Sequence, residues 1–284
     1  MSKSSNKIGI MHGRLSESID GKIQEFPKHT WKNEFEKASF LGFNSIEWIF
    51  DTYQKNPIMN IEGIDEIKKL VKQTDVKINS VLSDFFMEKK LFDVSQYDLE
   101  NSLSILKTLI KQSSLLDAKI IEIPFVDLSS LKSKENQLQV LSNLEIILPE
   151  LDEFDMSLAL ETDLPPKEFK EFITNFNHPK IKANYDVGNS ASLGYNITEE
   201  ITTLNDLIEN IHIKDRKLHG QTVPLGTGDV DFNLFFSLLK KINYSGELII
   251  QGARESNILC EDTAKKYLSF VEESVDKYLS NDEN

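Results

Sequence analysis

The sequence is poor in cysteine and in positive charge, and both shortages narrow the classes of protein that it can encode. Its 284 residues include one cysteine, Cys260, which excludes an intrachain disulfide, a zinc ribbon and a paired-thiol redox centre. Acidic residues outnumber basic residues by 46 to 32, giving a formal net charge of -14. Such a molecule repels phosphate backbones and anionic lipid surfaces, so we expect no nucleic-acid partner and no membrane partner.

Long hydrophobic runs are also missing. The start of the chain, Met1 to Lys7, is polar, and the apolar run behind it, Ile8 to Met11, is far shorter than a signal-peptide core. No stretch approaches the roughly 20 apolar residues that a membrane-spanning helix needs. These features predict a soluble, cytoplasmic protein, with residues 1–6 and 280–284 as flexible tails.

Strand-like and helix-like segments alternate along the chain. Eight short apolar segments with strand character begin at Ile8, Asn44, Val76, Lys119, Ser157, Ile181, Asn210 and Glu247. Each is followed by apolar residues at helical spacing, which predicts a single (β/α)8 TIM barrel over residues 1–284. An open doubly wound sheet is the alternative, but the turn after the first strand, Met11-His-Gly-Arg14, is not the Gly-rich turn that it favours.

Two prolines mark expected interruptions of these elements. Pro124 is expected to break the strand that begins at Lys119, so that this strand ends at Ile123. Pro149 lies inside the helix expected over Glu135 to Leu151 and should bend or end it.

Polar residues lie at the ends of four consecutive strands. Glu161 closes the fifth strand and Asp186 the sixth, His212 lies within the seventh, and Gln251 closes the eighth. The carboxyl ends of the strands form the active-site mouth of a TIM barrel, so these side chains are expected to converge. Oxygen donors with one imidazole suit an open divalent-cation site for Mn²⁺ or Mg²⁺, with Zn²⁺ and Co²⁺ as alternatives. Each residue alone is equally well explained as a solvated or structural group, so the hypothesis depends on their joint position.

Other candidates for substrate contact lie on further strand ends. Glu47 and Glu122 lie within the second and fourth strands, where an inward carboxylate would contact substrate or serve as a second acid or base. His12 and Arg14 follow the first strand, and Arg254 follows the last. These three are interpreted either as ligands for an anionic or hydroxylated substrate or as structural groups at the mouth.

A basic segment with two glycines is the candidate for phosphate recognition. Lys214, Arg216 and Lys217, together with Gly226-Thr-Gly228, would form a phosphate cradle in an otherwise acidic protein. A solvated loop is the equal alternative.

Several segments, in order and in register, resemble the xylose isomerase-like sugar isomerase/epimerase superfamily, and within it the L-ribulose-5-phosphate (L-xylulose-5-phosphate) 3-epimerase group. They are Gly42-Phe-Asn-Ser-Ile-Glu47, Leu158-Ala-Leu-Glu161, Tyr185-Asp-Val-Gly-Asn189, Ile211-His-Ile-Lys-Asp215, Val223-Pro-Leu-Gly-Thr-Gly-Asp-Val-Asp-Phe232 and Tyr244-Ser-Gly246. The resemblance implies that Glu161, Asp186 and His212 bind a metal and that Glu161 also transfers a proton. The epimerases carry a glutamate as fourth ligand and second base, where this chain has Gln251.

The reaction that this resemblance implies is proton abstraction beside the carbonyl of a ketose, through a metal-stabilised enediolate. An amide can bind a metal but cannot carry a proton, so Gln251 favours an isomerase or an atypical epimerase whose second acid is Glu122 or Glu47. The expected partner is a small sugar or sugar phosphate, and the expected assembly is a homodimer or homotetramer.

Three other functions remain open at this point. A dehydratase of the inosose or dehydroshikimate type would share the first step, and a non-catalytic sugar-binding relative would explain the loss of the glutamate at Gln251. A phosphodiesterase resembling the apurinic endonucleases is disfavoured, because the chain has 5 histidines and a strong negative charge.

Overall fold

Eight parallel strands, buried along most of their length, close into a barrel in the computed structural model, which describes residues 7–18 and 21–279. In chain order they are β1 (Ile8–Met11), β2 (Ser45–Ile49), β3 (Ser80–Leu82), β4 (Ile120–Phe125), β5 (Ser157–Thr162), β6 (Ile181–Asp186), β7 (Ile208–Ile213) and β10 (Glu247–Ile250). The last strand pairs with both β7 and β1, which closes the sheet. The predicted (β/α)8 TIM barrel is therefore confirmed, whereas the predicted tails, residues 1–6 and 280–284, lie outside the described residues.

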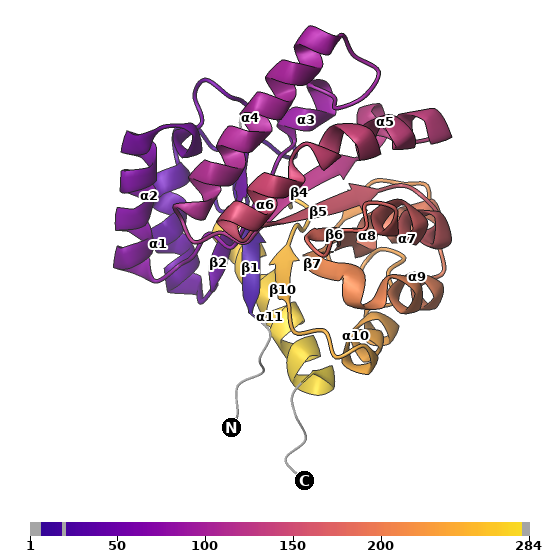
Figure 1. Ribbon diagram of the computed structural model, residues 1–284. Helices are drawn as coiled ribbons and strands as arrows, with labels where there is room; N and C mark the ends of the chain where they lie inside the picture. Colours follow the sequence, from indigo (N-terminus) through magenta and orange to yellow (C-terminus); the bar gives the residue numbers. More distant parts are fainter. Residues whose placement is uncertain (1–6, 19–20, 280–284) are drawn as a thin grey trace.

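The helices surround the strands, as Figure 1 shows. They are α1 (Trp31–Leu41), α2 (Ile61–Thr74), α3 (Phe85–Glu88), α4 (Gln96–Ser114), α5 (Lys134–Glu145), α6 (Leu148–Phe154), α7 (Pro166–Thr174), α8 (Val187–Leu193), α9 (Ile197–Leu204), α10 (Phe232–Lys241) and α11 (Cys260–Tyr278), with 3₁₀ turns at Pro57–Met59, Asp127–Ser129 and Asn205–Leu207. A two-stranded hairpin of β8 (Asp215–Arg216) and β9 (Thr222–Val223) follows β7. Within the described part of the chain, no helix is long and apolar enough to cross a membrane.

Pro124 does not end β4 as predicted, because the strand continues to Phe125. The pairing explains why a proline is tolerated. The carbonyl of Glu122 accepts a hydrogen bond from the Ser83 amide, so alternate residues of β4 direct their backbone groups toward β3. Strand β3 ends at Leu82, opposite Glu122, so the missing N–H of Pro124 faces a side where no strand remains.

The segment predicted as one helix around Pro149 forms two, α5 and α6. Pro149 lies in the first turn of α6, where its missing N–H would have no partner inside the helix. The helix is therefore interrupted just before Pro149, as the sequence predicted.

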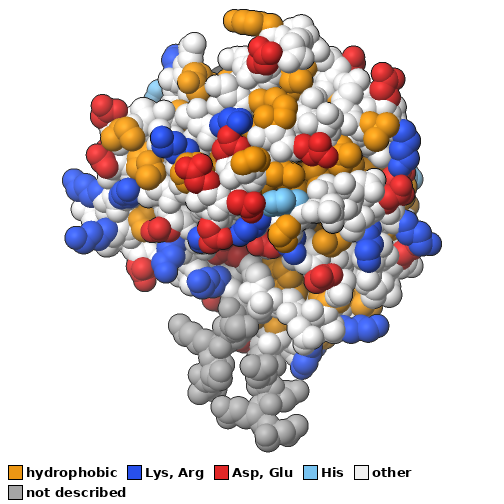
Figure 2. Space-filling view, in the orientation of Figure 1, with side chains coloured by type: hydrophobic (Ala, Val, Ile, Leu, Met, Phe, Trp, Pro, Cys, Tyr) orange, Lys and Arg blue, Asp and Glu red, His pale blue; other side chains and the backbone are white. Residues whose placement is uncertain are grey.

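Large apolar side chains pack between strands and helices, among them the fully buried Trp48, Phe35 and Phe235. Figure 2 shows acidic and basic side chains interspersed with hydrophobic ones over one face of the molecule. Inside the barrel the packing is different, because several carboxylates, amides and one imidazole are buried there. This polar interior leads to the candidate site.

Candidate active site

His212 lies at the centre of a cluster of carboxylates inside the barrel. It is fully buried on β7, opposite Asp186 of β6 and Ile249 of β10 in the strand register. Its neighbours Ile211 and Ile213 are fully buried as well. Side chains alternate along a strand, so these isoleucines face the surrounding helices while the imidazole faces the barrel interior.

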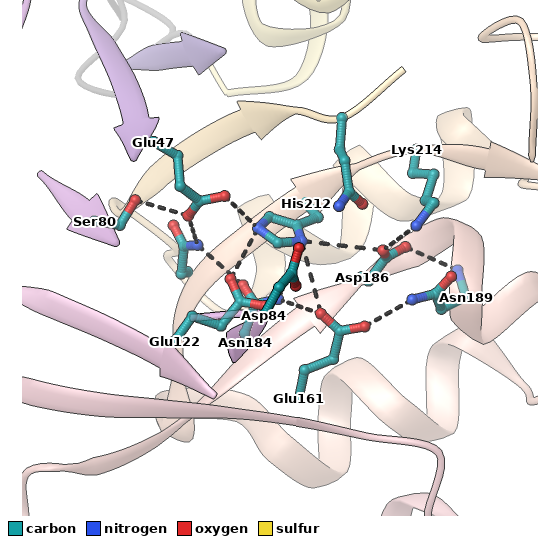
Figure 3. A network of polar contacts seen from close by, with 12 residues as sticks. Glu47, Ser80, Asp84, Glu122, Glu161, Asn184, Asp186, Asn189, His212 and Lys214 are labelled. Carbon is teal, nitrogen blue, oxygen red and sulfur yellow. Dashed lines mark hydrogen bonds and ion pairs between the residues drawn. The ribbon is translucent and has the colours of Figure 1, made fainter. Parts of the chain in front are cut away.

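Acidic side chains approach both nitrogens of the ring (Figure 3). His212 Nε2 lies 2.7 Å from Glu47 Oε2 and 3.0 Å from Glu122 Oε2. His212 Nδ1 lies 3.7 Å from Glu161 Oε2 and 4.0 Å from Asp186 Oδ2. The cluster thus contains an inner acidic pair, Glu47 and Glu122, and an outer pair, Glu161 and Asp186.

Burial and mutual charge determine the protonation of this cluster. Burial would lower the pKa of His212, but the charges of Glu122 and Glu47 outweigh burial and raise that pKa well above its ordinary value. Burial also raises the pKa of Glu122 well above its usual range, against the opposing effect of His212. Glu122 Oε2 lies 3.0 Å from His212 Nε2, so the protonation of these two groups is linked.

The outer pair and His212 provide a set of donors that suits a divalent cation. Ligand atoms of Glu161, Asp186 and His212 all lie within 4.8 Å of one another, and the same holds for Glu47, Glu122 and His212. Gln251 Oε1 is buried with no hydrogen-bond partner among the described residues. Two carboxylates, an imidazole and an unpaired amide oxygen match the mixed oxygen and nitrogen ligands of Mn²⁺, Mg²⁺ or Zn²⁺ sites.

Two asparagines orient the carboxylate of Glu161. Asn184 Nδ2 donates to Glu161 Oε2 at 2.9 Å, and Asn189 Nδ2 donates to Glu161 Oε1 at 2.6 Å. Asn189 is itself held by Arg216, whose Nη1 donates to Asn189 Oδ1 at 2.9 Å. The sequence analysis did not assign a role to either asparagine, although both lie within three residues of Asp186.

Asp186 serves the fold and the cluster at once. Its Oδ1 accepts the Asn189 amide at 2.8 Å and so caps helix α8, which the sequence analysis did not predict. Its other oxygen, Oδ2, accepts a hydrogen bond from Lys214 Nζ at 3.1 Å. One carboxylate oxygen is therefore fixed by the backbone, and the other faces His212 and Lys214.

A cavity of about 620 Å³ opens at this end of the barrel, a volume that suits a sugar-sized ligand. Six residues predicted as site residues line it, namely Arg14, Glu122, Glu161, Lys214, Arg216 and Gln251. The other 15 residues of the wall were not selected from the sequence, and Asp186 and His212 are not part of the wall.

Three other predicted substrate contacts lie elsewhere. His12 is fully buried between the rings of Phe26 and Trp48, and burial lowers its pKa to about 3. Glu47 is buried behind His212, where its Oε1 accepts hydrogen bonds from Ser80 and Asn210. Neither side chain is part of the described cavity wall.

Arg254, the third of these residues, ties two loops together instead of facing the cavity. Its Nη1 donates to the carbonyl of Ser16 at 2.7 Å, and its Nη2 donates to the carbonyl of Gly13 at 2.6 Å. Both bonds join the loop after β10 to the loop after β1. The structure therefore supports the structural interpretation of Arg254.

Gln24 and Asp84 complete the wall near Gln251, and the sequence analysis did not select them. Gln251 Nε2 donates to Gln24 Oε1 at 2.9 Å, and Gln24 Nε2 donates to Asp84 Oδ2 at 2.7 Å. Burial raises the pKa of Asp84 to about 6, and the nearby charge of Glu161 acts in the same direction. Asp84 is the second residue after β3, so a polar residue at the end of a strand, the same signal that pointed to Glu161, could have identified it.

A closed parallel barrel with buried acids and a histidine at its carboxyl end defines a class of (β/α)8 protein whose polar groups could hold a metal ion. Comparison with known families is more specific. The model of the xylose isomerase-like TIM barrel family matches residues 35–270, and the chain belongs to this family.

Individual relatives show the same likeness over nearly the whole chain. A Haemophilus influenzae protein named "Putative L-ribulose-5-phosphate 3-epimerase SgbU" is 27% identical over 268 residues, which cover 89% of this chain and 90% of that protein. The solved structure of an L-ribulose 3-epimerase has a TM-score of 0.78 at 14% identity, covering 98% of this chain and 99% of the other. The IOLI protein, solved with a zinc atom, has a TM-score of 0.78 at 15% identity and covers 97% of this chain and 100% of its own.

Proposed function

We propose that the protein is a metal-dependent isomerase or epimerase that acts on a ketose sugar through an enediolate. The observation that carries this proposal is the convergence of Glu161, Asp186 and His212 beside a sugar-sized cavity. The relatives named as L-ribulose 3-epimerase and L-ribulose-5-phosphate 3-epimerase support the reaction class.

The proposed cation ligands are Glu161, Asp186, His212 and Gln251. Their donor atoms favour Mn²⁺ or Mg²⁺, with Zn²⁺ or Co²⁺ as alternatives. When bound, the cation would polarise the substrate carbonyl and offset the negative charge that develops on the enediolate oxygens. Such a charge also compensates the two outer carboxylates, which the fold brings close together.

Glu161 is the proposed base for the proton beside the carbonyl. Asn184 and Asn189 each bind one of its oxygens, so the carboxylate has a fixed orientation before substrate enters. Glu161 lines the cavity, which places its oxygens within reach of a bound sugar.

Glu122 is the proposed second acid, because Gln251 cannot carry a proton. Burial favours its protonated form, and its side chain lines the same cavity as Glu161. A neutral carboxyl group can donate a proton to the enediolate, which leaves Glu122 ionised and Glu161 protonated, and exchange with solvent then returns both groups to their starting forms. Gln251 meanwhile donates its amide hydrogen to Gln24, which leaves Oε1 for a ligand.

Arg14, Lys214 and Arg216 are the proposed contacts for substrate oxygens, because all three line the cavity. The substrate contacts predicted for His12, Glu47 and Arg254 are not retained, because their positions favour structural roles. The expected homodimer or homotetramer remains a prediction.

The test is isotope exchange in deuterated water. Ketopentoses, ketohexoses and their phosphates are incubated with protein and Mn²⁺ or Mg²⁺, and NMR records deuterium at the carbon beside the carbonyl. Glu161→Gln should lower the exchange rate by about 100-fold or more, the usual contribution of a general base. Glu145→Gln, an exposed charge change at the end of α5, is the matched control.

Several outcomes separate this proposal from its rivals. A lack of exchange with every ketose and metal would contradict an enediolate mechanism. Exchange with loss of water from the product would identify a dehydratase. A protein that binds sugar, binds no divalent ion and is unaffected by His212→Ala would be a non-catalytic relative.

A further inference from the structure

The loop predicted as a phosphate cradle already holds an anion that the protein supplies itself. Asp215 is fully buried, and its Oδ2 accepts the amides of Gly226 at 2.9 Å and Gly228 at 2.7 Å. Its Oδ1 accepts the amide of Val230 at 3.3 Å. Converging backbone amides are the groups that would bind a phosphate, so Asp215 occupies the position that a phosphate would need.

The contact between Asp215 and this loop is too close for another group to enter. A Cβ atom built on Gly228 would lie 1.9 Å from Asp215 Oδ1. Lys217, the third basic residue of the predicted cradle, is directed to Asp229 at 3.6 Å. The loop is therefore closed around a carboxylate, and the prediction of a phosphate cradle is not supported.

The basic side chains that line the cavity are likewise bonded to protein acceptors. Arg14 donates to the carbonyls of Gly252 at 3.1 Å and Ile23 at 2.8 Å. Arg216 donates to the carbonyl of Gly220 and to Asn189. These hydrogen bonds already hold loops and orienting groups in place, which leaves fewer N–H groups of either arginine for the several oxygens of a phosphate.

Lys214 is the remaining basic residue of the wall, and it pairs with Asp186 at 3.1 Å. A cation at Asp186 would compete with this ammonium and free it for a substrate oxygen. A single ammonium beside a divalent cation suits a hydroxyl or carbonyl oxygen, whereas phosphate sites combine several charges with backbone amides.

Acidic side chains outnumber basic side chains in the cavity wall by five to three. Asp84, Asp127 and Asp163 line it in addition to Glu122 and Glu161. Asp163 accepts hydrogen bonds from Ser130, and Asp127 is exposed at the edge. A phosphate dianion in this cavity would therefore lie near several like charges, whereas sugar hydroxyls can donate hydrogen bonds to them.

We infer that the substrate is a ketose without a phosphate group, recognised through its hydroxyls by the acidic wall of this cavity. The inference rests on the proposed ketose chemistry and adds the class of sugar. It separates this chain from the function in the name of its Haemophilus influenzae relative, an L-ribulose-5-phosphate 3-epimerase.

The experiment compares each free ketopentose and ketohexose with its terminal phosphate, using metal-loaded protein and product analysis by NMR. The free sugar should have the higher kcat/KM by at least about tenfold, because contacts between like charges are strongly unfavourable. Higher kcat/KM for the phosphate would overturn the inference and leave the proposed reaction intact. Absence of turnover with both members of every pair would instead overturn the proposed reaction.

A charge variant tests the stated cause. Asp127→Asn removes one exposed carboxylate of the wall and should shift the kcat/KM ratio toward the phosphate by a few-fold, with a smaller effect at high salt. Glu145→Gln, the same type of change at the end of α5, should leave the ratio unchanged. If both variants give the wild-type ratio, the acidic wall is not the cause of discrimination and the inference fails.

Discussion

Replacement of Asp215 by alanine tests whether the glycine loop is held by the protein's own carboxylate. The change removes the acceptor of two short amide hydrogen bonds, from Gly226 and Gly228, and of a longer one from Val230. A hydrogen bond to a charged group contributes about 1.5–3 kcal/mol, and the two short bonds together about 3–6 kcal/mol. Gly226 is exposed and Gly228 is half-buried, so water will replace part of the lost hydrogen bonding to their amides. We therefore expect the free energy of unfolding to fall by about 3 kcal/mol.

This loss corresponds to a clear change in thermal stability. Unfolding entropy of about 2.1 cal/mol/K per residue gives about 0.6 kcal/mol/K for the chain, so Asp215→Ala should lower Tm by about 5 °C. Calorimetry with and without inorganic phosphate provides the assay. Phosphate should raise the Tm of the variant more than that of the wild type, because only the variant has unpaired loop amides.

Two results would refute the reasoning about the loop. An equal gain in Tm with phosphate for both proteins would mean that the wild-type loop accepts anions in the presence of Asp215. A loss well below 1 kcal/mol would mean that the hydrogen bonds of Asp215 to the loop amides contribute little to stability. Asp231→Ala is a useful comparison, because it removes a single exposed helix-cap bond to the Leu234 amide.

Two further predictions concern the loop after β1 and the fourth proposed ligand. Burial raises the pKa of Glu34 from 4.5 to about 7. Between pH 4.5 and pH 7 the folded state therefore keeps a proton that the unfolded state releases, and the stability of the fold falls as pH rises through this range. Glu34→Gln should remove this loss, so the variant should be more stable than the wild type by up to about 3 kcal/mol at pH 8 but not at pH 4. Urea unfolding at both pH values measures the difference. Parallel pH profiles of stability for the two proteins would contradict the prediction. Gln251→Glu adds a carboxylate to an acidic cluster, so it should bind Mn²⁺ about tenfold more tightly, as calorimetric titration measures, and should lower the Tm of the metal-free protein. Weaker Mn²⁺ binding by the variant would exclude Gln251 as a ligand position.

The barrel could be predicted because its signals are repeated. Each strand is apolar and is followed by a helical pattern, so an error of several residues in one element leaves the order unchanged. Strand β3 shows this, because it was expected to begin at Val76 and begins at Ser80. Pro124 was a real error, since the end of the neighbouring strand determines whether a proline is tolerated, and sequence alone does not give that register.

The sequence indicated which side chains lie close together where topology sufficed, but not where side-chain direction mattered. Glu161, Asp186 and His212 follow from strand order, because adjacent strands bring their ends together. Arg254 illustrates the failure, because a guanidinium beside a cavity can face the ligand or the backbone carbonyls that close a loop. That choice depends on the path of two loops, which have no periodic pattern to read.

The position of His212 between two acidic pairs determines which ring atom is left for a ligand. Nε2 faces Glu47 at 2.7 Å, so the ring proton is held on the inner side. Nδ1 faces Glu161 and Asp186 on the outer side. An arriving cation would meet a ring already turned with Nδ1 toward Glu161 and Asp186, so no ring rotation has to precede binding. Metal uptake then requires the ring to lose its Nδ1 proton and Lys214 to leave Asp186, but no rotation of the imidazole.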